Sequence, residues 1–165
     1  MRKASRSPHS LDPGEGKRGE EGHLGYLLRQ AGVAFRVRME RALADLEVTL
    51  PQFAVLTMVA AYPGLSNADL ARLSLLTPQT VSVIVGNLKR SGAVKSRPHA
   101  VHGRIQHLDL TGDGKSLLLR CRQRVRVVEE QLAGGLREEE ERVIRRWLVR
   151  VAVDAAESSE KQTKL

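Results

Sequence analysis

Basic side chains concentrate in residues 86–126 of this 165-residue sequence. The stretch holds ten lysines and arginines against two acids, Asp109 and Asp113, so its formal charge is +8. The whole chain also carries +8, so the remaining residues are neutral as a group. A localised basic zone is typical of a surface that binds a polyanion, and nucleic acid is the first expectation. The basic residues are Lys89, Arg90, Lys95, Arg97, Arg104, Lys115, Arg120, Arg122, Arg124 and Arg126.

Other residue patterns that could carry chemistry are excluded by their spacing. Gly114-Lys115-Ser116 is similar to the end of a phosphate-binding loop, but Asp109 stands where that motif requires a glycine. His99, His102 and His107 are not accompanied by the further nitrogen or sulfur donors of a metal site, so we expect no metal and no cofactor. No serine–histidine–acid or paired-carboxylate arrangement is visible, and we expect no enzymatic activity.

The single cysteine, Cys121, excludes an intrachain disulfide and favours a reducing compartment. It lies between Leu118 and Val125 on the apolar seam of a predicted helix, where a free thiol behaves as a small hydrophobic residue. We expect a structural cysteine, and the alternative is a thiol that senses oxidants.

Composition indicates a globular chain, with 41% hydrophobic and 28% charged residues. The longest mostly apolar run covers residues 53–62, far fewer than the roughly 20 that cross a bilayer. The first 22 residues contain no apolar segment of the kind found in signal peptides. We therefore expect a cytoplasmic protein that does not bind membranes.

Caps and apolar spacing predict the helices that position the basic zone. Apolar residues at helical spacing predict a first helix over 23–48. Thr49 and Gln52 match a capping box that opens a largely buried second helix. Ser66 caps a short third helix, and Thr77, followed by a proline, caps a fourth helix.

A hairpin and two long helices follow. Gly92 suits the left-handed end of the fourth helix. Residues 93–97 and 104–110 flank a loop bounded by proline and glycine, which predicts a two-stranded hairpin. Thr111 is expected to cap a long helix, and a final helix opens with four glutamates. The result is a mainly α fold with a small β-hairpin, whose middle part is a winged helix-turn-helix.

The sequence resembles the MarR family of bacterial transcription regulators. The segments that carry the resemblance are LSNADLARLSLLTPQTVSVIVGNLKRSGAVKSR and, after a short loop, GRIQHLDLTGDG, within a likeness over residues 24–153. Two features depart from the family. Val83 and Gly86 stand where a basic residue is frequent in the recognition helix, and His102-Gly103-Arg104 replaces the usual Asp-x-Arg.

The resemblance implies an obligate homodimer that presents two winged helix-turn-helix units to a palindromic operator in double-stranded DNA. The apolar stripes of the flanking helices agree, because they exceed what the middle unit could cover. We expect a disordered tail (1–22), an N-terminal dimerisation helix (23–48), the winged helix-turn-helix (49–112), C-terminal dimerisation helices (113–156) and a flexible tail (157–165).

The resemblance also implies which residues meet DNA, since the second helix of the motif enters the major groove and the wing reaches the minor groove. The expected groove-facing residues are Thr77, Gln79, Thr80, Ser82, Val83 and Asn87. The amides of Gln79 and Asn87 can pair bidentately with adenine. Phosphate contacts are expected from Lys89, Arg90, Lys95 and Arg97, and the minor-groove contact from Arg104.

Members of the family often bind small aromatic acids between the dimer helices and the winged domain. Tyr26 and Phe53 are candidates for that crevice, although the sequence assigns no effector site. Our first hypothesis is a sequence-specific, ligand-responsive DNA-binding repressor. The alternatives are a non-specific or architectural nucleic-acid-binding protein with the same fold, and a helical scaffold whose basic face is incidental. The hydrogen-bonding residues expected on the fourth helix favour the first, because a purely electrostatic binder would carry Lys and Arg there.

Overall fold

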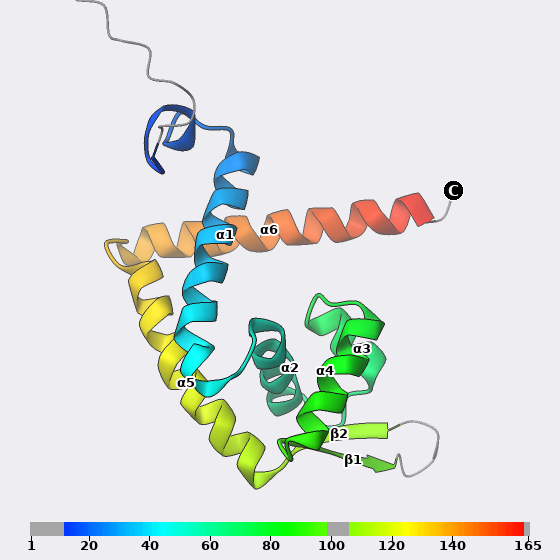
Figure 1. Ribbon diagram of the computed structural model, residues 1–165. Helices are drawn as coiled ribbons and strands as arrows, with labels where there is room; N and C mark the ends of the chain where they lie inside the picture. Colours follow the sequence, from blue (N-terminus) through cyan, green and yellow to red (C-terminus); the bar gives the residue numbers. More distant parts are fainter. Residues whose placement is uncertain (1–11, 99–105, 164–165) are drawn as a thin grey trace, which may run out of the picture. The chain divides into compact units, whose positions relative to one another are not determined.

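The computed structural model describes residues 12–98 and 106–163, which form two compact units, one ending at Val125 and the other beginning at Arg126. The structure confirms the mainly helical fold with one hairpin (Figure 1). The elements are η2 (Gly16–Arg18), α1 (Leu24–Leu43), η3 (Ala44–Leu46), α2 (Leu50–Ala61), α3 (Asn67–Leu73), α4 (Pro78–Arg90), β1 (Val94–Pro98), β2 (Gln106–Leu110), α5 (Gly112–Ala133) and α6 (Glu138–Thr163).

The predicted caps of α2 and α4 are present. The Thr49 hydroxyl accepts a hydrogen bond from the Gln52 amide at 3.3 Å, and the Gln52 side chain accepts one from the Thr49 amide at 2.9 Å. This reciprocal box satisfies two backbone N–H groups that lack helical partners. Thr77 caps α4 by accepting a bond from the Thr80 amide at 3.2 Å. Local sequence therefore fixes where both helices begin.

The helix ends differ from expectation at both termini of the chain. α6 continues to Thr163, beyond the predicted end at residue 156, because residues 157–163 contain no glycine or proline and are rich in helix-forming residues. In the segment predicted as a tail, residues 16–18 form η2. There the Gln30 side-chain amide donates to the Arg18 carbonyl at 3.0 Å, which ties the segment to α1.

One apolar core lies among α2, α3, α4 and the hairpin, and it includes Leu118 from α5. α4 packs against α2 and α3, β1 contacts α4, and β2 contacts α2 (Figure 1). The buried members of this core are Val55, Leu56, Val59, Leu70, Ala71, Val81, Ile84, Val85, Leu88, Ala93, Val94, Leu108 and Leu118. Burial of these apolar side chains is the main force that holds the helix-turn-helix and hairpin together.

The hairpin is antiparallel, with Val94 opposite Leu110 and Pro98 opposite Gln106. The loop between α2 and α3 joins its edge, because the Leu108 amide donates to the Leu65 carbonyl at 3.3 Å. The hairpin is therefore anchored to the helix-turn-helix on both sides, by its strand connection to α4 and by this bridge.

A crowded junction joins the end of α4 to the start of α5. Gly92 adopts a left-handed φ of 76°, which turns the chain into β1. The Thr111 hydroxyl donates to the Gly92 carbonyl at 2.6 Å and accepts from the Gly114 amide at 3.0 Å. The Thr111 amide donates to the Ala93 carbonyl at 3.1 Å. A Cβ at Gly114 would lie 1.9 Å from that carbonyl oxygen, so only glycine fits.

The second unit holds the end of α5 and all of α6. Ion pairs four residues apart, Glu138–Arg142 at 2.9 Å and Glu141–Arg145 at 2.6 Å, confirm the predicted pairing on its first turns. Trp147 of α6 is half-buried, and the exposed large apolar side chains of α6 are Val143, Ile144, Leu148, Val149, Val151 and Val153. Within the described ranges no single helix is long and apolar enough to cross a bilayer, and α1–η3 with α2 reach that length only as a pair bent by 80°.

We predict that Gly114→Ala destabilises the protein by about 1–3 kcal/mol, because the new methyl group must displace the Ala93 backbone. Gly112→Ala is the matched control, since a Cβ there meets nothing within 4 Å. Urea denaturation of both variants measures the difference. Equal stability of the two variants would show that the junction adapts without cost.

Candidate nucleic-acid interface

α4 is amphipathic, and its two faces separate the core from the expected DNA-reading residues. Val81, Ile84, Val85 and Leu88 are buried in the core. Thr77, Gln79, Thr80, Ser82 and Val83 are exposed, and Asn87 is half-buried.

Three of the expected hydroxyl groups already make hydrogen bonds within α4. The Thr77 and Thr80 hydroxyls lie 2.8 Å apart and share a hydrogen bond. The Ser82 hydroxyl donates to the Pro78 carbonyl at 2.9 Å. Their first role is therefore to stabilise the helix, although each oxygen keeps capacity to accept another bond.

Gln79 and Val83 are the most available side chains of this face. Within the described residues the Gln79 amide makes no hydrogen bond, so its donor and acceptor are both open to a partner. Val83 is 64% exposed, which is unusual for an apolar side chain on a helix with a well-formed buried face. The pair offers one bidentate hydrogen-bonding group and one methyl surface one turn apart.

Asn87 is held by a neighbour. The Arg90 guanidinium donates a hydrogen bond to the Asn87 side-chain carbonyl, so this carbonyl already has a partner within the helix. Gly86 lies beside this pair, and a Cβ there would meet only Nη1 of Arg90, at 3.7 Å. No other part of the described chain approaches this glycine closely.

Basic side chains flank α4. Lys89, Arg90, Lys95 and Arg97 are all exposed. Nε of Arg97 lies 2.6 Å from Oδ2 of Asp109, its near neighbour across the hairpin, so part of its charge is neutralised. Arg104, the expected minor-groove residue, lies outside the described residues, as do His99 and His102.

Leu75 is a residue that sequence reasoning missed. It lies in the turn between α3 and α4 with a left-handed φ of 55° and is 92% exposed. A leucine in this backbone conformation costs conformational free energy. Because the side chain is exposed, no burial of apolar surface offsets that cost. The sequence signal that could have indicated this residue is a leucine at a position in the helix-turn-helix turn where glycine would fit the backbone.

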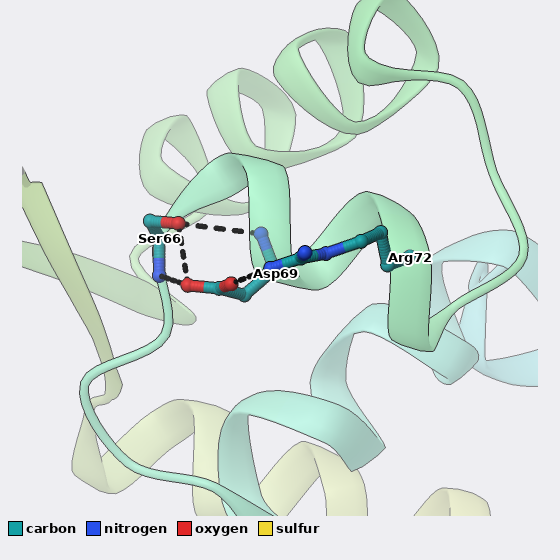
Figure 2. A network of polar contacts seen from close by, with 3 residues as sticks. All are labelled: Ser66, Asp69 and Arg72. Carbon is teal, nitrogen blue, oxygen red and sulfur yellow. Dashed lines mark hydrogen bonds and ion pairs between the residues drawn. The ribbon is translucent and has the colours of Figure 1, made fainter. Parts of the chain in front are cut away.

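A polar network stabilises the start of α3, the helix that precedes α4 in the helix-turn-helix (Figure 2). The Ser66 hydroxyl donates to Oδ2 of Asp69 at 2.6 Å and accepts from the Asp69 amide at 3.2 Å. The Arg72 guanidinium donates to the other carboxylate oxygen. The Ser66 hydrogen bond, followed by that of Arg72, holds the pKa of Asp69 below its ordinary value.

We predict that this network makes stability fall in acid. The stabilisation from ionised Asp69 is complete above about pH 4 and is lost as the pH falls through the lowered folded pKa. The free energy of unfolding should therefore decrease less between pH 5 and 3 in Asp69→Asn than in the wild type, measured by urea denaturation. Ser66→Ala removes the largest cause and should shift the profile in the same direction. Identical acid sensitivity of all three proteins would contradict this role.

Cys121 and the histidines offer no reactive centre among the described residues. Cys121 is fully buried, and burial raises the pKa of its thiol against the smaller opposing effect of Arg120. A buried thiol with a raised pKa is a poor nucleophile, which supports its structural interpretation. No group of three metal-ligating side chains occurs in the described ranges.

A cavity of about 570 Å³ opens in the first unit, on the side of the hairpin base. Its walls come from the end of α2, the hairpin and the first turns of α5, and neither Tyr26 nor Phe53 lines it. The lining residues are Val59, Ala60, Pro63, Lys95, Asp109, Leu110, Lys115, Leu118, Leu119 and Arg122.

Comparisons with known proteins agree with this architecture. A family model described as the MarR family matches residues 46–105. The HTH-type transcriptional repressor Rv2887 of Mycobacterium tuberculosis is 35% identical over 136 residues, which cover 82% of this chain and 97% of the relative.

Solved structures of Rv2887, described there as a MarR family protein, are similar in fold. Its complex with DNA has a TM-score of 0.65 and 34% identity, and covers 79% of this chain and 98% of that chain. Its complex with salicylic acid has a TM-score of 0.64 and 33% identity, and covers 80% of this chain and 98% of that one.

Proposed function

This chain belongs to the MarR family of transcription regulators, and we propose that it represses transcription by binding a palindromic operator as a homodimer, with a small aromatic acid as its effector. The observation that carries the proposal is the outer face of α4, where Gln79 and Val83 are exposed beside several exposed cations. This face is polar and apolar rather than charged, which suits reading of base edges.

In this proposal α4 enters the major groove, and its side chains make different kinds of contact with the DNA. Gln79 pairs with an adenine, and Val83 contacts a thymine methyl group. Asn87 reads a base with its side-chain N–H₂ group, since its side-chain carbonyl accepts a hydrogen bond from Arg90. Thr77, Thr80 and Ser82 hold the start of α4 in shape and add contacts at the groove edge.

The flanking cations position the protein on the duplex. Lys89, Arg90, Lys95 and Arg97 contact phosphates, which supply affinity without sequence information. Arg104 is the proposed minor-groove residue. The complex of the relative Rv2887 with DNA supports DNA as the partner of this chain.

Exposed apolar side chains support the homodimer. In the first unit α1 leaves Leu24, Leu28, Val33 and Val37 exposed, and in the second unit α6 leaves a row of leucine, isoleucine and valine side chains exposed. Exposed apolar surface of this extent is typical of a protein–protein interface. We propose that α1, α6 and the C-terminal part of α5 form the dimerisation region.

We predict that Gln79→Ala and Lys95→Ala weaken DNA binding in different ways. Gln79→Ala should lose about 1–3 kcal/mol of preference for the operator while binding to scrambled DNA is nearly unchanged. Lys95→Ala should weaken binding to both duplexes and reduce the slope of log K against log salt by about 0.9 for each phosphate that the lysine no longer neutralises.

Binding isotherms at three salt concentrations, on a scrambled duplex and on an operator mapped by footprinting upstream of the chain's own gene, measure both effects. The half-sites should lie about 10 base pairs apart, one turn of the duplex. Equal loss of affinity for both duplexes in Gln79→Ala would show that α4 does not read the sequence.

A second prediction concerns the dimer. The double substitution Ile144→Glu and Leu148→Glu places two charges on the exposed apolar row of α6 and should produce a folded monomer with weakened operator binding. Arg146→Glu, also exposed on α6, is the control for added negative charge. Light scattering after size exclusion gives the mass, and a double variant that keeps the mass of two chains would exclude this part of α6 from the interface.

A further inference from the structure

The turn between α3 and α4 is built on a backbone motif in which glycine is the usual residue. The Leu76 amide donates to the Ala71 carbonyl at 3.0 Å, and the Leu75 amide donates to the Arg72 carbonyl at 3.3 Å. These two bonds form a Schellman motif, which satisfies the last carbonyls of a helix and places a left-handed residue at the position of Leu75. Leu75 adopts the required φ of 55°, a conformation that glycine would adopt without steric cost.

The leucine side chain at this position contributes nothing to the core. It is 92% exposed, whereas the next residue, Leu76, packs against the apolar core. A side chain that is strained and not buried does not stabilise the folded chain, and strain of this kind is concentrated at functional positions. Contact with another molecule accounts for both the strain and the exposure of Leu75.

The position of Leu75 in the fold points to DNA as that molecule. Leu75 lies two residues before Thr77, the N-cap of α4. In a helix-turn-helix on DNA, the first helix crosses the backbone and the N-terminal residues of the second contact base edges, so the turn between them lies at the edge of the major groove. An apolar side chain there can contact the methyl group of thymine, which no other DNA base carries.

The surroundings of the leucine favour DNA over a protein partner. Leu73, at the end of α3, adds some apolar surface, since it is 43% exposed. The other exposed residues nearby are mostly polar or charged: Arg72, Thr77, Gln79 and Thr80. Apolar surface interrupted in this way is smaller than a typical protein-binding patch. Hydrogen-bonding groups beside one apolar side chain are instead what the edges of bases require.

We propose that Leu75 is a further sequence-reading residue of the interface and that it contacts a thymine methyl group at the edge of each half-site. This assignment rests on the proposed function, in which α4 enters the major groove. Val83 is the thymine contact proposed on α4 itself, so Leu75 adds a second contact at a different base pair. The leucine thereby lowers the stability of the fold and raises the preference for thymine at that base pair.

Replacement of single operator thymines by uracil tests the contact, because the two bases differ only in the methyl group. In an operator mapped by footprinting, uracil at one position in each half-site should weaken wild-type binding about fourfold, the effect of one buried methyl group. Leu75→Ala should bind this uracil duplex and the thymine duplex with equal Kd. Val83→Ala should lose its methyl dependence at a different position and keep it at this one.

Leu75→Gly separates the stability of the fold from the DNA contact. Glycine adopts a φ of 55° without strain, so this variant should melt about 2–4 °C above the wild type. It should nevertheless bind the operator as weakly as Leu75→Ala does. Leu119→Ala is the control, because it removes a leucine that is 59% exposed on α5, outside the helix-turn-helix. This variant should keep the operator affinity and the uracil sensitivity of the wild type.

Two results would overturn the proposal: the same response of the wild type and Leu75→Ala to uracil at every thymine, or a lower melting temperature in Leu75→Gly than in the wild type. Gln79→Ala is measured in the same series. If it loses its preference for the operator while Leu75→Ala keeps every methyl dependence, α4 reads the operator and Leu75 serves another partner. If the wild type binds operator and scrambled duplexes equally, the proposed function fails, and the contact of Leu75 fails with it.

Discussion

Hydrogen bonds of Thr111 hold together the end of α4, the start of the hairpin and the start of α5. Its hydroxyl donates to the carbonyl of Gly92 at the end of α4 and accepts from the amide of Gly114 at the start of α5, while the Thr111 backbone holds Ala93 at the start of the hairpin. The approach is so close that Gly114 has no room for a Cβ. The bond to the Gly114 amide satisfies an N–H that the start of α5 leaves without a helical partner, and the other two bonds satisfy the carbonyls of Gly92 and Ala93 in the connection between α4 and β1.

This joint connects the elements that carry the proposed DNA-contacting residues to the start of α5. α4 carries Gln79, the hairpin carries Lys95, and α5 carries Lys115, and all three elements leave the same junction. The cavity opens beside it, where Leu118 of α5 enters the core that also packs the buried face of α4.

The helix starts could be predicted from sequence because the bonds that make them are local. Thr49 with Gln52, Ser66 with Asp69, and Thr77 with Thr80 each lie three residues apart, and the structure contains every one of these caps. Leu75 shows the opposite case. Its left-handed φ of 55° is unfavourable for a leucine, so the residue type does not predict its conformation. The extension of α6 to Thr163 was also missed, because residues 157–163 are all polar and carry no apolar spacing that would predict a helix, although they contain no glycine or proline that would end one.

The basic zone shows that charge along a sequence predicts a basic segment but not where the fold places each cation. Its ten cations predicted one polyanion-binding surface, but the fold distributes them among different tasks. Arg97, Arg124 and Arg126 pair with Asp109, Asp45 and Glu130, two of which come from outside the zone. Lys95, Lys115 and Arg122 line a cavity whose apolar walls come from residues as distant as Val59, so no local pattern could have indicated it. A net charge of +8 therefore overstates the surface available to phosphates, because the fold pairs some of these cations with carboxylates and places others in the lining of a cavity.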